Sequence, residues 1–188
     1  MKRHLFQLLR LLLISALAGA AWVAHRPAEV PDVSLKPRQD DLLDMLRQAA
    51  IKRAAVMEVS EADVNLHLAR TLKGRLGASL GDWVVFEGAR VDLEPGVARV
   101  FLVWSLKGQR RTASVDLTIS RDEHDYHIEM LRGAYGHLHM PRGMMRPLYP
   151  ALRAVAETLD PEIKALFQMT RITIAKDKLL LDPRFPTA

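Results

Sequence analysis

The feature that most constrains this chain is a change in its hydrophobic period near Asp82. From residue 82 to residue 120 apolar and polar side chains alternate in three successive segments, which is typical of half-buried β-strands. Turns containing Gly96 and Gly108 separate these segments. A fourth alternating segment follows residue 123 and continues to about residue 140. Short turns between alternating strands predict a four-stranded antiparallel meander.

Apolar residues at helical spacing flank the strands on both sides. Before them, the pattern predicts one helix from about Gln39 to Met57 and a second that begins at Ser60, with Asp63 completing a capping box. Gly74 and Gly77 are expected to end the second helix.

After the strands, a helical segment is expected over about residues 143–167, with a break at Asp160-Pro161 where a proline can open a new helix. Residues 171–181 are expected to form one bent strand or a small hairpin. The order of elements predicts an α+β fold in which a curved sheet wraps on helices. We expect residues 39–188 to form this single domain.

The first 24 residues combine a basic head with an apolar stretch over residues 5–24, which indicates a signal peptide or a signal anchor. Small residues near Ala18 offer cleavage sites. In the alternative, an uncleaved anchor, Arg10 snorkels toward the cytoplasmic face and Trp22 lies at the interface. We favour the anchor, which places the protein in the bacterial cell envelope, held in the inner membrane with the domain outside the cytoplasm. Cleavage of the leader would instead make it a secreted protein.

Residues 25–38 contain three prolines in a polar context, which indicates either an extended linker or an ordered arm packed on the domain. Without Lys2, Arg3 and Arg10, 24 basic residues balance 22 acidic ones, so the exported part is nearly neutral and nucleic acid is not an expected partner. The chain has no cysteine, which excludes disulfides and cysteine-based metal sites.

Histidines and acidic residues near the fourth strand are the only candidates for metal chemistry. His127 and Glu129 share one face of that strand, and His137 and His139 share the same parity farther along. A fully extended strand would separate the two pairs by more than about 25 Å. We therefore interpret them as solvated polar residues. No nucleophile elbow, phosphate-binding loop or zinc-protease motif occurs in the sequence, so we expect no catalytic residue, no metal ligand, no cofactor and no enzymatic activity.

Part of the predicted sheet is apolar on both faces, because Val84, Phe86, Val97, Phe101 and Val103 oppose the main apolar side. The N-terminal helices, a partner or an apolar ligand must cover this second face. The segment Met140-Pro-Arg-Gly-Met-Met-Arg then offers flexible apolar surface beside positive charge, suited to an acyl chain and a phosphate headgroup or to filling one end of the core. The candidate ligand-binding residues are Phe86, Phe101, Val103, Met140, Arg142, Met144, Met145, Arg146 and Leu148.

The chain resembles the YpmS-like membrane-anchored proteins and, more distantly, the LmeA-like phospholipid-binding proteins of bacterial envelopes. Besides the N-terminal anchor, four segments carry the resemblance: residues 59–68, 91–100, 136–141 and 171–181. It implies an extracytoplasmic domain with an apolar groove between a curved sheet and helices, in which a lipid chain lies. It implies no catalytic residue.

Two functions fit these features. The first is a membrane-tethered, non-enzymatic domain that binds a phospholipid, an acyl chain or another apolar ligand in a groove between sheet and helices. The second is an interaction module that docks a protein partner of an envelope or secretion assembly on the same apolar face. A deep pocket favours the first function, and a shallow patch with a polar rim favours the second.

Overall fold

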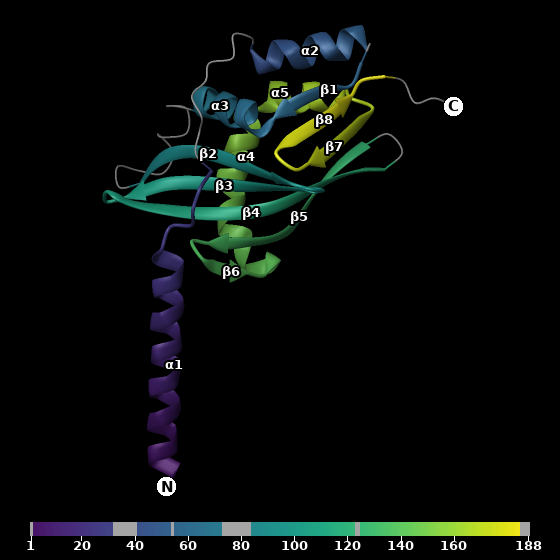
Figure 1. Ribbon diagram of the computed structural model, residues 1–188. Helices are drawn as coiled ribbons and strands as arrows, with labels where there is room; N and C mark the ends of the chain where they lie inside the picture. The colour runs from purple at the N-terminus through teal and green to yellow at the C-terminus, as the bar shows by residue number, and fades with distance from the viewer. Residues whose placement is uncertain (1, 32–40, 54, 73–83, 123–124, 185–188) are drawn as a thin grey trace.

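The computed structural model describes residues 2–31, 41–53, 55–72, 84–122 and 125–184. It is an α+β fold with two antiparallel sheets, which confirms the predicted class (Figure 1). The helices are α1 (Lys2–His25), α2 (Leu42–Lys52), α3 (Glu61–Thr71), the 3-10 helix η1 (Arg142–Leu148), α4 (Tyr149–Thr158) and α5 (Asp160–Phe167). The strands are β1 (Met57–Ser60), β2 (Val84–Glu94), β3 (Val97–Leu106), β4 (Gln109–Asp122), β5 (Asp125–Tyr135), β6 (Leu138–Met140), β7 (Arg171–Ala175) and β8 (Lys178–Asp182).

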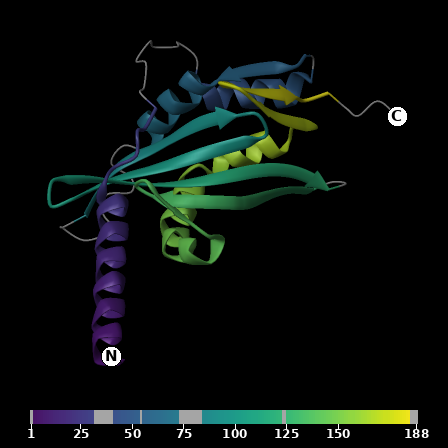
Figure 2. The same ribbon diagram turned by 60° about the horizontal axis from the view of Figure 1, so that its bottom comes forward.

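The larger sheet has the strand order β2-β3-β4-β5-β6, and the smaller has the order β1-β8-β7. Helix α4 runs behind the larger sheet and leads to α5, which lies with α2, α3 and the smaller sheet at the far end of the domain (Figure 1). Helix α1 projects from the opposite end, as a second view also shows (Figure 2).

The predicted meander is confirmed as β2 to β5, but its last strand is shorter than expected. Gly136, at a φ of 55°, turns the chain so that β6 folds back on β5. A left-handed conformation of this kind is one that glycine adopts at little cost.

The N-terminal helices follow the predicted pattern with one correction. Ser60 caps α3 as predicted, accepting a hydrogen bond from the Asp63 amide at 3.1 Å. The preceding helix ends at Lys52 rather than Met57, because residues 57–60 form β1 and pair with β8. The predicted stops at Gly74 and Gly77 lie outside the described residues.

The predicted C-terminal helical segment is divided among η1, α4 and α5. The expected break at Asp160-Pro161 is confirmed, since α4 ends at Thr158 and α5 begins at Asp160. The chain then closes with the β7–β8 hairpin, the second of the two predicted alternatives.

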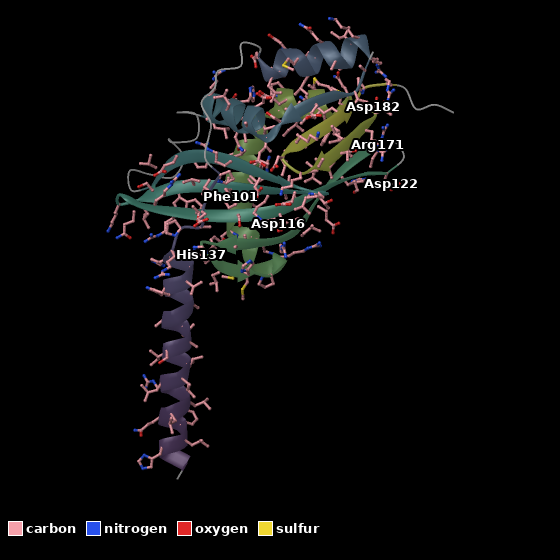
Figure 3. All side chains as sticks on the ribbon, in the orientation of Figure 1. Phe101, Asp116, Asp122, His137, Arg171 and Asp182 are labelled. Atoms are coloured by element: carbon pink, nitrogen blue, oxygen red, sulfur yellow. The ribbon has the colours of Figure 1, made fainter. Side chains whose placement is uncertain are left out.

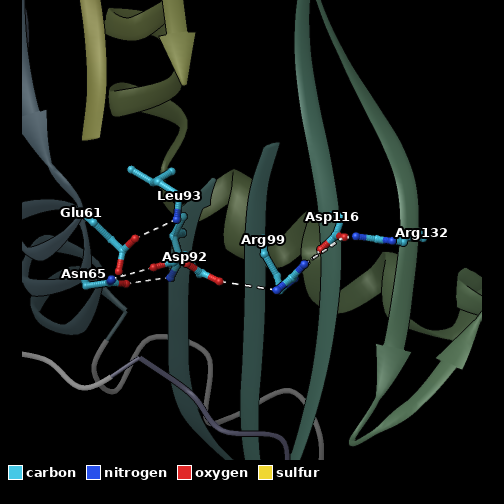
Figure 4. Close-up of polar contacts among 8 residues, drawn as sticks. Glu61, Asn65, Asp92, Leu93, Arg99, Asp116 and Arg132 are labelled. Carbon is cyan, nitrogen blue, oxygen red and sulfur yellow. Dashed lines mark hydrogen bonds and ion pairs between the residues drawn. The ribbon is translucent and has the colours of Figure 1, made fainter. Parts of the chain in front are cut away.

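Side chains of α3 cover the free edge of β2 (Figure 4). The Asn65 amide group bonds both the N–H and the C=O of Val91 at 2.7 Å, and Glu61 accepts from the Leu93 amide at 2.7 Å. These contacts replace the bonds of a missing neighbouring strand. Burial raises the pKa of Glu61, and the negative charge of Asp92 raises it further against the opposing effect of the Leu93 bond.

Helix α1 contains the one stretch among the described residues that is long and apolar enough to cross a membrane. It covers His4–His25 with a mean hydropathy of 1.7, and none of its apolar window is buried within the molecule. A core helix would be buried, so this exposure fits a membrane anchor or a signal sequence.

The extended residues 26–31, which we call the arm, cross the larger sheet after α1 (Figure 1). The Ala28 amide donates to Thr112 Oγ1 at 2.8 Å. The described part of the proline-containing segment is therefore an ordered arm on the domain, one of its two predicted forms.

Candidate functional site

The two faces of the larger sheet have different covers. The helix-covered face packs against α3, α4 and η1, and its buried side chains include Ala89, Leu102, Ala113 and Val115. The arm-covered face carries residues of the opposite parity and lies under the arm; it includes Arg99, Phe101, Ser114, Asp116 and Arg132.

A groove of about 740 Å³ lies between the helix-covered face and the helices α4 and α5. The sheet contributes Val100, Leu117 and Met130 to its walls, and the helices contribute Leu152, Val155 and Ile163. This volume is within the range of about 300–1,000 Å³ that is usual for ligand pockets. The walls are mostly aliphatic, so the groove suits an apolar ligand.

The rim of the groove is polar, and each of its two arginines contacts a carboxylate; Arg153 pairs with Glu157 at 2.8 Å. Arg142 contacts Glu129 at 3.0 Å through its guanidinium and donates to the Leu131 carbonyl at 3.1 Å. Arg153 and Tyr149 are also exposed residues of this rim. The arrangement places apolar surface inside and guanidinium groups at the opening, as an amphipathic ligand requires.

A smaller cavity of about 140 Å³, the inner cavity, extends the apolar space toward α2 and the smaller sheet. It shares Leu68, Leu159 and Leu166 with the groove. At its polar end, His67 contacts Glu162 at 2.8 Å. The sequence analysis did not single out these two residues, because their pairing joins α3 to α5 across 95 positions of the chain.

The sheet separates the predicted ligand-binding residues into groups. Met145 and Leu148 are buried on the helix-covered face, where the partly buried Phe86 and Met140 also pack. Phe101 and Val103 are buried on the opposite side. Met144 and Arg146 are exposed, and Arg142 is the member that lines the groove.

Of two β-bulges in the larger sheet, the first explains part of this separation. Between Phe86 and Gly88 the register of β2 shifts, and Phe86 joins the helix-covered face whereas Val85 is 57% exposed. A second shift, between Asp116 and Leu117 of β4, leaves Leu131 unpaired in the register. Each inserted residue reverses the inward and outward parity of the strand beyond it.

The apolar walls of the groove follow the sequence pattern. Val100 alternates with Phe101 in a predicted strand, and Leu152, Val155 and Ile163 are apolar residues at helical spacing in the segment predicted to be helical. The periodicity therefore identified both walls. It carried no information about the space between them, which depends on how far the helices stand from the sheet.

The arm-covered face holds a charged cluster built around Asp116 (Figure 4). Asp116 is 4% exposed and accepts from Arg99 Nε at 2.7 Å and from Arg132 Nε at 2.6 Å. Burial alone would raise the pKa of Asp116, but the two guanidinium groups outweigh burial and hold the pKa below its ordinary value of 3.8. The hydrogen bond to Asp116 also raises the pKa of Arg99.

A second cavity of about 260 Å³ lies under the arm and is lined by Phe101, Asp116, His137 and Glu29 among others. Figure 3 places His137 beside the end of α1 that meets the sheet. Because the carboxylate of Asp116 is already paired with two arginines, this cavity is part of a structural cluster and has less apolar surface than the groove.

The histidine pairs considered for metal binding remain apart. Gly136 does turn the chain, but His139 pairs opposite Ala134 rather than near His127, and Glu129 contacts Arg142. Within the described ranges, no group of three or more histidine or acidic residues is arranged to hold a metal ion.

No protein-family model, no curated protein and no solved structure matches this chain.

Proposed function

We propose that this protein is a membrane-tethered, non-enzymatic domain that binds the acyl portion of a lipid in the groove, outside the cytoplasm in the cell envelope. The observation that carries this proposal is the groove itself: about 740 Å³ of mostly aliphatic space between the sheet and α4. Each methylene transferred from water into such a site contributes about 0.8 kcal/mol, so an acyl chain gains affinity in proportion to its length.

The position of the groove between two layers of the domain favours a small ligand over a protein partner. The groove lies between two layers of the domain and continues into the inner cavity, whereas a protein-docking surface is usually a broad and shallow patch. An acyl chain is narrow enough to enter such a space.

The polar rim and the anchor favour a lipid over other apolar ligands. Arg142 and Arg153 at the rim are exposed, and each would exchange its present partner, Glu129 or Glu157, for the phosphate or carboxylate of a headgroup while the chain lies inside. Helix α1, if it remains uncleaved, holds the domain beside a bilayer that supplies such lipids.

Neighbouring residues of β3 provide a matched test, because Val100 faces the groove and Phe101 faces the cavity under the arm. We would place the full chain in vesicles that contain a phospholipid with a photoreactive group on its acyl chain, irradiate, and map the cross-linked peptides. We expect cross-links on α4 in the wild type. Val100→Trp should fill the groove and reduce them at least about tenfold, whereas Phe101→Trp should leave them unchanged.

Cross-links on α1 serve as the internal control, because a membrane helix contacts lipid whether or not the groove is occupied. If α1 is labelled and α4 is not, the lipid-binding proposal is wrong. Should Val100→Trp fail to fold, Ala156→Trp at the rim tests the same site from the opposite wall.

A further inference from the structure

The orientation of α1 relative to the domain is set by close backbone contacts. The His137 amide donates to the Val23 carbonyl at 3.4 Å. The backbone of Ala24 lies so close to Gly136 that a Cβ at that position would overlap it. The turn between β5 and β6 is therefore packed directly on the last turn of α1.

A second set of contacts joins the same end of α1 to the sheet. Arg111 donates to the His25 carbonyl at 3.2 Å. The guanidinium of Arg26 lies 3.7 Å from the centre of the Trp22 ring, which is the residue expected at the membrane interface. With Trp22 at the interface, as the sequence predicts, the bilayer surface would lie at the level where α1 meets the domain.

Helix η1 lies at this membrane end of the domain. Figures 1 and 2 both place β6 and the η1 segment that follows it at the end of the domain from which α1 projects. Because α1 and the sheet are in contact, a bilayer that holds α1 would lie on the same side as η1.

The side chains of η1 suit a lipid surface. A 3-10 helix has three residues per turn, so Met145 and Leu148 share one face, and both are buried against the sheet. The remaining faces point outward: Met144 is 59% exposed, Tyr149 just beyond η1 is 48% exposed, and Arg146 is exposed as well. An apolar side chain, an aromatic ring with a polar tip and an arginine are a combination found at membrane interfaces.

We infer that η1 rests on the bilayer surface and forms the entrance through which a lipid reaches the groove. Met144 and Tyr149 lie in the interface and Arg146 contacts lipid phosphates. Tyr149 and Arg142 also belong to the rim of the groove, and α4 leads from there away from the membrane (Figure 1). The entrance rests on the proposed lipid binding, whereas the membrane contact of η1 is independent of it.

The absence of cysteine from the sequence allows a direct test of the membrane contact. Met144→Cys carries an environment-sensitive fluorophore, and Ile51→Cys, 82% exposed on α2 at the far end, is the matched control. The full chain is placed in vesicles of phosphatidylcholine and phosphatidylglycerol with brominated acyl chains. We expect quenching at position 144 and none at position 51. If the brominated chains quench the fluorophore at position 144 no more than at position 51, the membrane contact is overturned.

The rate of lipid uptake tests the entrance. Met144→Glu with Arg146→Glu adds negative charge to η1, and Arg47→Glu with Ile51→Glu adds the same charge to α2. Photoreactive lipid is supplied from donor vesicles, and the appearance of cross-links on α4 is followed over time. We expect the first pair to slow this appearance about fivefold or more and to leave the final amount of α4 cross-links unchanged. The α2 pair should change neither. An unchanged rate in the η1 pair would overturn the entrance.

Absence of α4 cross-links in the wild type would instead refute the proposed function and the entrance with it, and the quenching result would still decide the membrane contact.

Discussion

The two faces of the larger sheet are built from the same alternating strands, yet they differ in how they are closed. On the arm-covered face Asp116 is buried and paired with two arginines, and the arm is fixed by the hydrogen bond from Ala28 to Thr112. On the helix-covered face aliphatic side chains meet aliphatic side chains, and a groove of about 740 Å³ remains between them.

The difference follows from the directionality of the contacts. A buried carboxylate requires partners at hydrogen-bonding distance, so a charged cluster holds its elements at fixed positions. Apolar contacts are not directional, so helices can pack on one part of a sheet and stand away from another. The polar face therefore serves structure, and the apolar face has the larger space for a ligand.

The largest effect is expected from truncation on the helix-covered face. Leu102 is 1% exposed, and Leu102→Ala should lower the free energy of unfolding by about 2–5 kcal/mol through lost burial and a residual cavity. Urea unfolding followed by tryptophan fluorescence would measure it. Leu106→Ala, at an exposed position of the same strand, should cost less than about 1 kcal/mol. Equal losses in the two variants would contradict the assignment of this face as the core.

An intermediate effect is expected at the centre of the charged cluster. Asp116→Asn removes the charge that pairs with Arg99 and Arg132 and should cost about 2 kcal/mol at neutral pH. The loss should shrink at about 1 M salt, where screening weakens partly exposed ion pairs, while that of Leu102→Ala should not. A loss below about 0.5 kcal/mol at low salt would show that the cluster is not held by charge.

The same substitution should alter the dependence of stability on pH. Because the folded pKa of Asp116 lies below 3.8, its contribution is complete above pH 3.8 and is lost as the pH falls through the lowered pKa. The difference in stability between wild type and Asp116→Asn should therefore be constant near neutral pH and decrease in strong acid. A difference that grows toward low pH would contradict the assigned ion pairs.

The smallest effect is expected at the attachment of the arm. Thr112→Val keeps the shape of the side chain but removes the acceptor for the Ala28 amide, at a cost of about 0.5–1.5 kcal/mol. Hydrogen exchange at Ala28 should accelerate, while lipid cross-linking on α4 should remain unchanged. Thr118→Val, whose hydroxyl donates to the Gly96 carbonyl elsewhere, is the matched control. Accelerated exchange at Ala28 in this control would show that the arm is not held through Thr112.

Local patterns were sufficient to predict much of the fold. The cap at Ser60, the helix break before Pro161 and the alternating strands depend on neighbouring residues, and all of them are present in the structure. The strand β1 was missed because it exists through its pairing with β8, about 120 residues later in the chain. A four-residue strand has too few positions to be recognised by alternation.

The predicted site was less accurate than the fold, for a related reason. Alternation correctly separates Val100 from Phe101, but the bulge beside Gly88 reverses the parity of Phe86 without a change in the pattern of the sequence. A set of apolar residues chosen from sequence thus came to lie on both sides of one sheet.

The sequence by itself determined the α+β class, the order of the longer helices and strands and the apolar N-terminal helix, because these depend on local hydrophobic period and composition. The tertiary structure alone decided which face of the larger sheet was closed by ion pairs and which face was left with a groove. It also placed η1 at the end where α1 leaves the domain. Those properties depend on distances between elements far apart in the chain, and no local pattern encodes them.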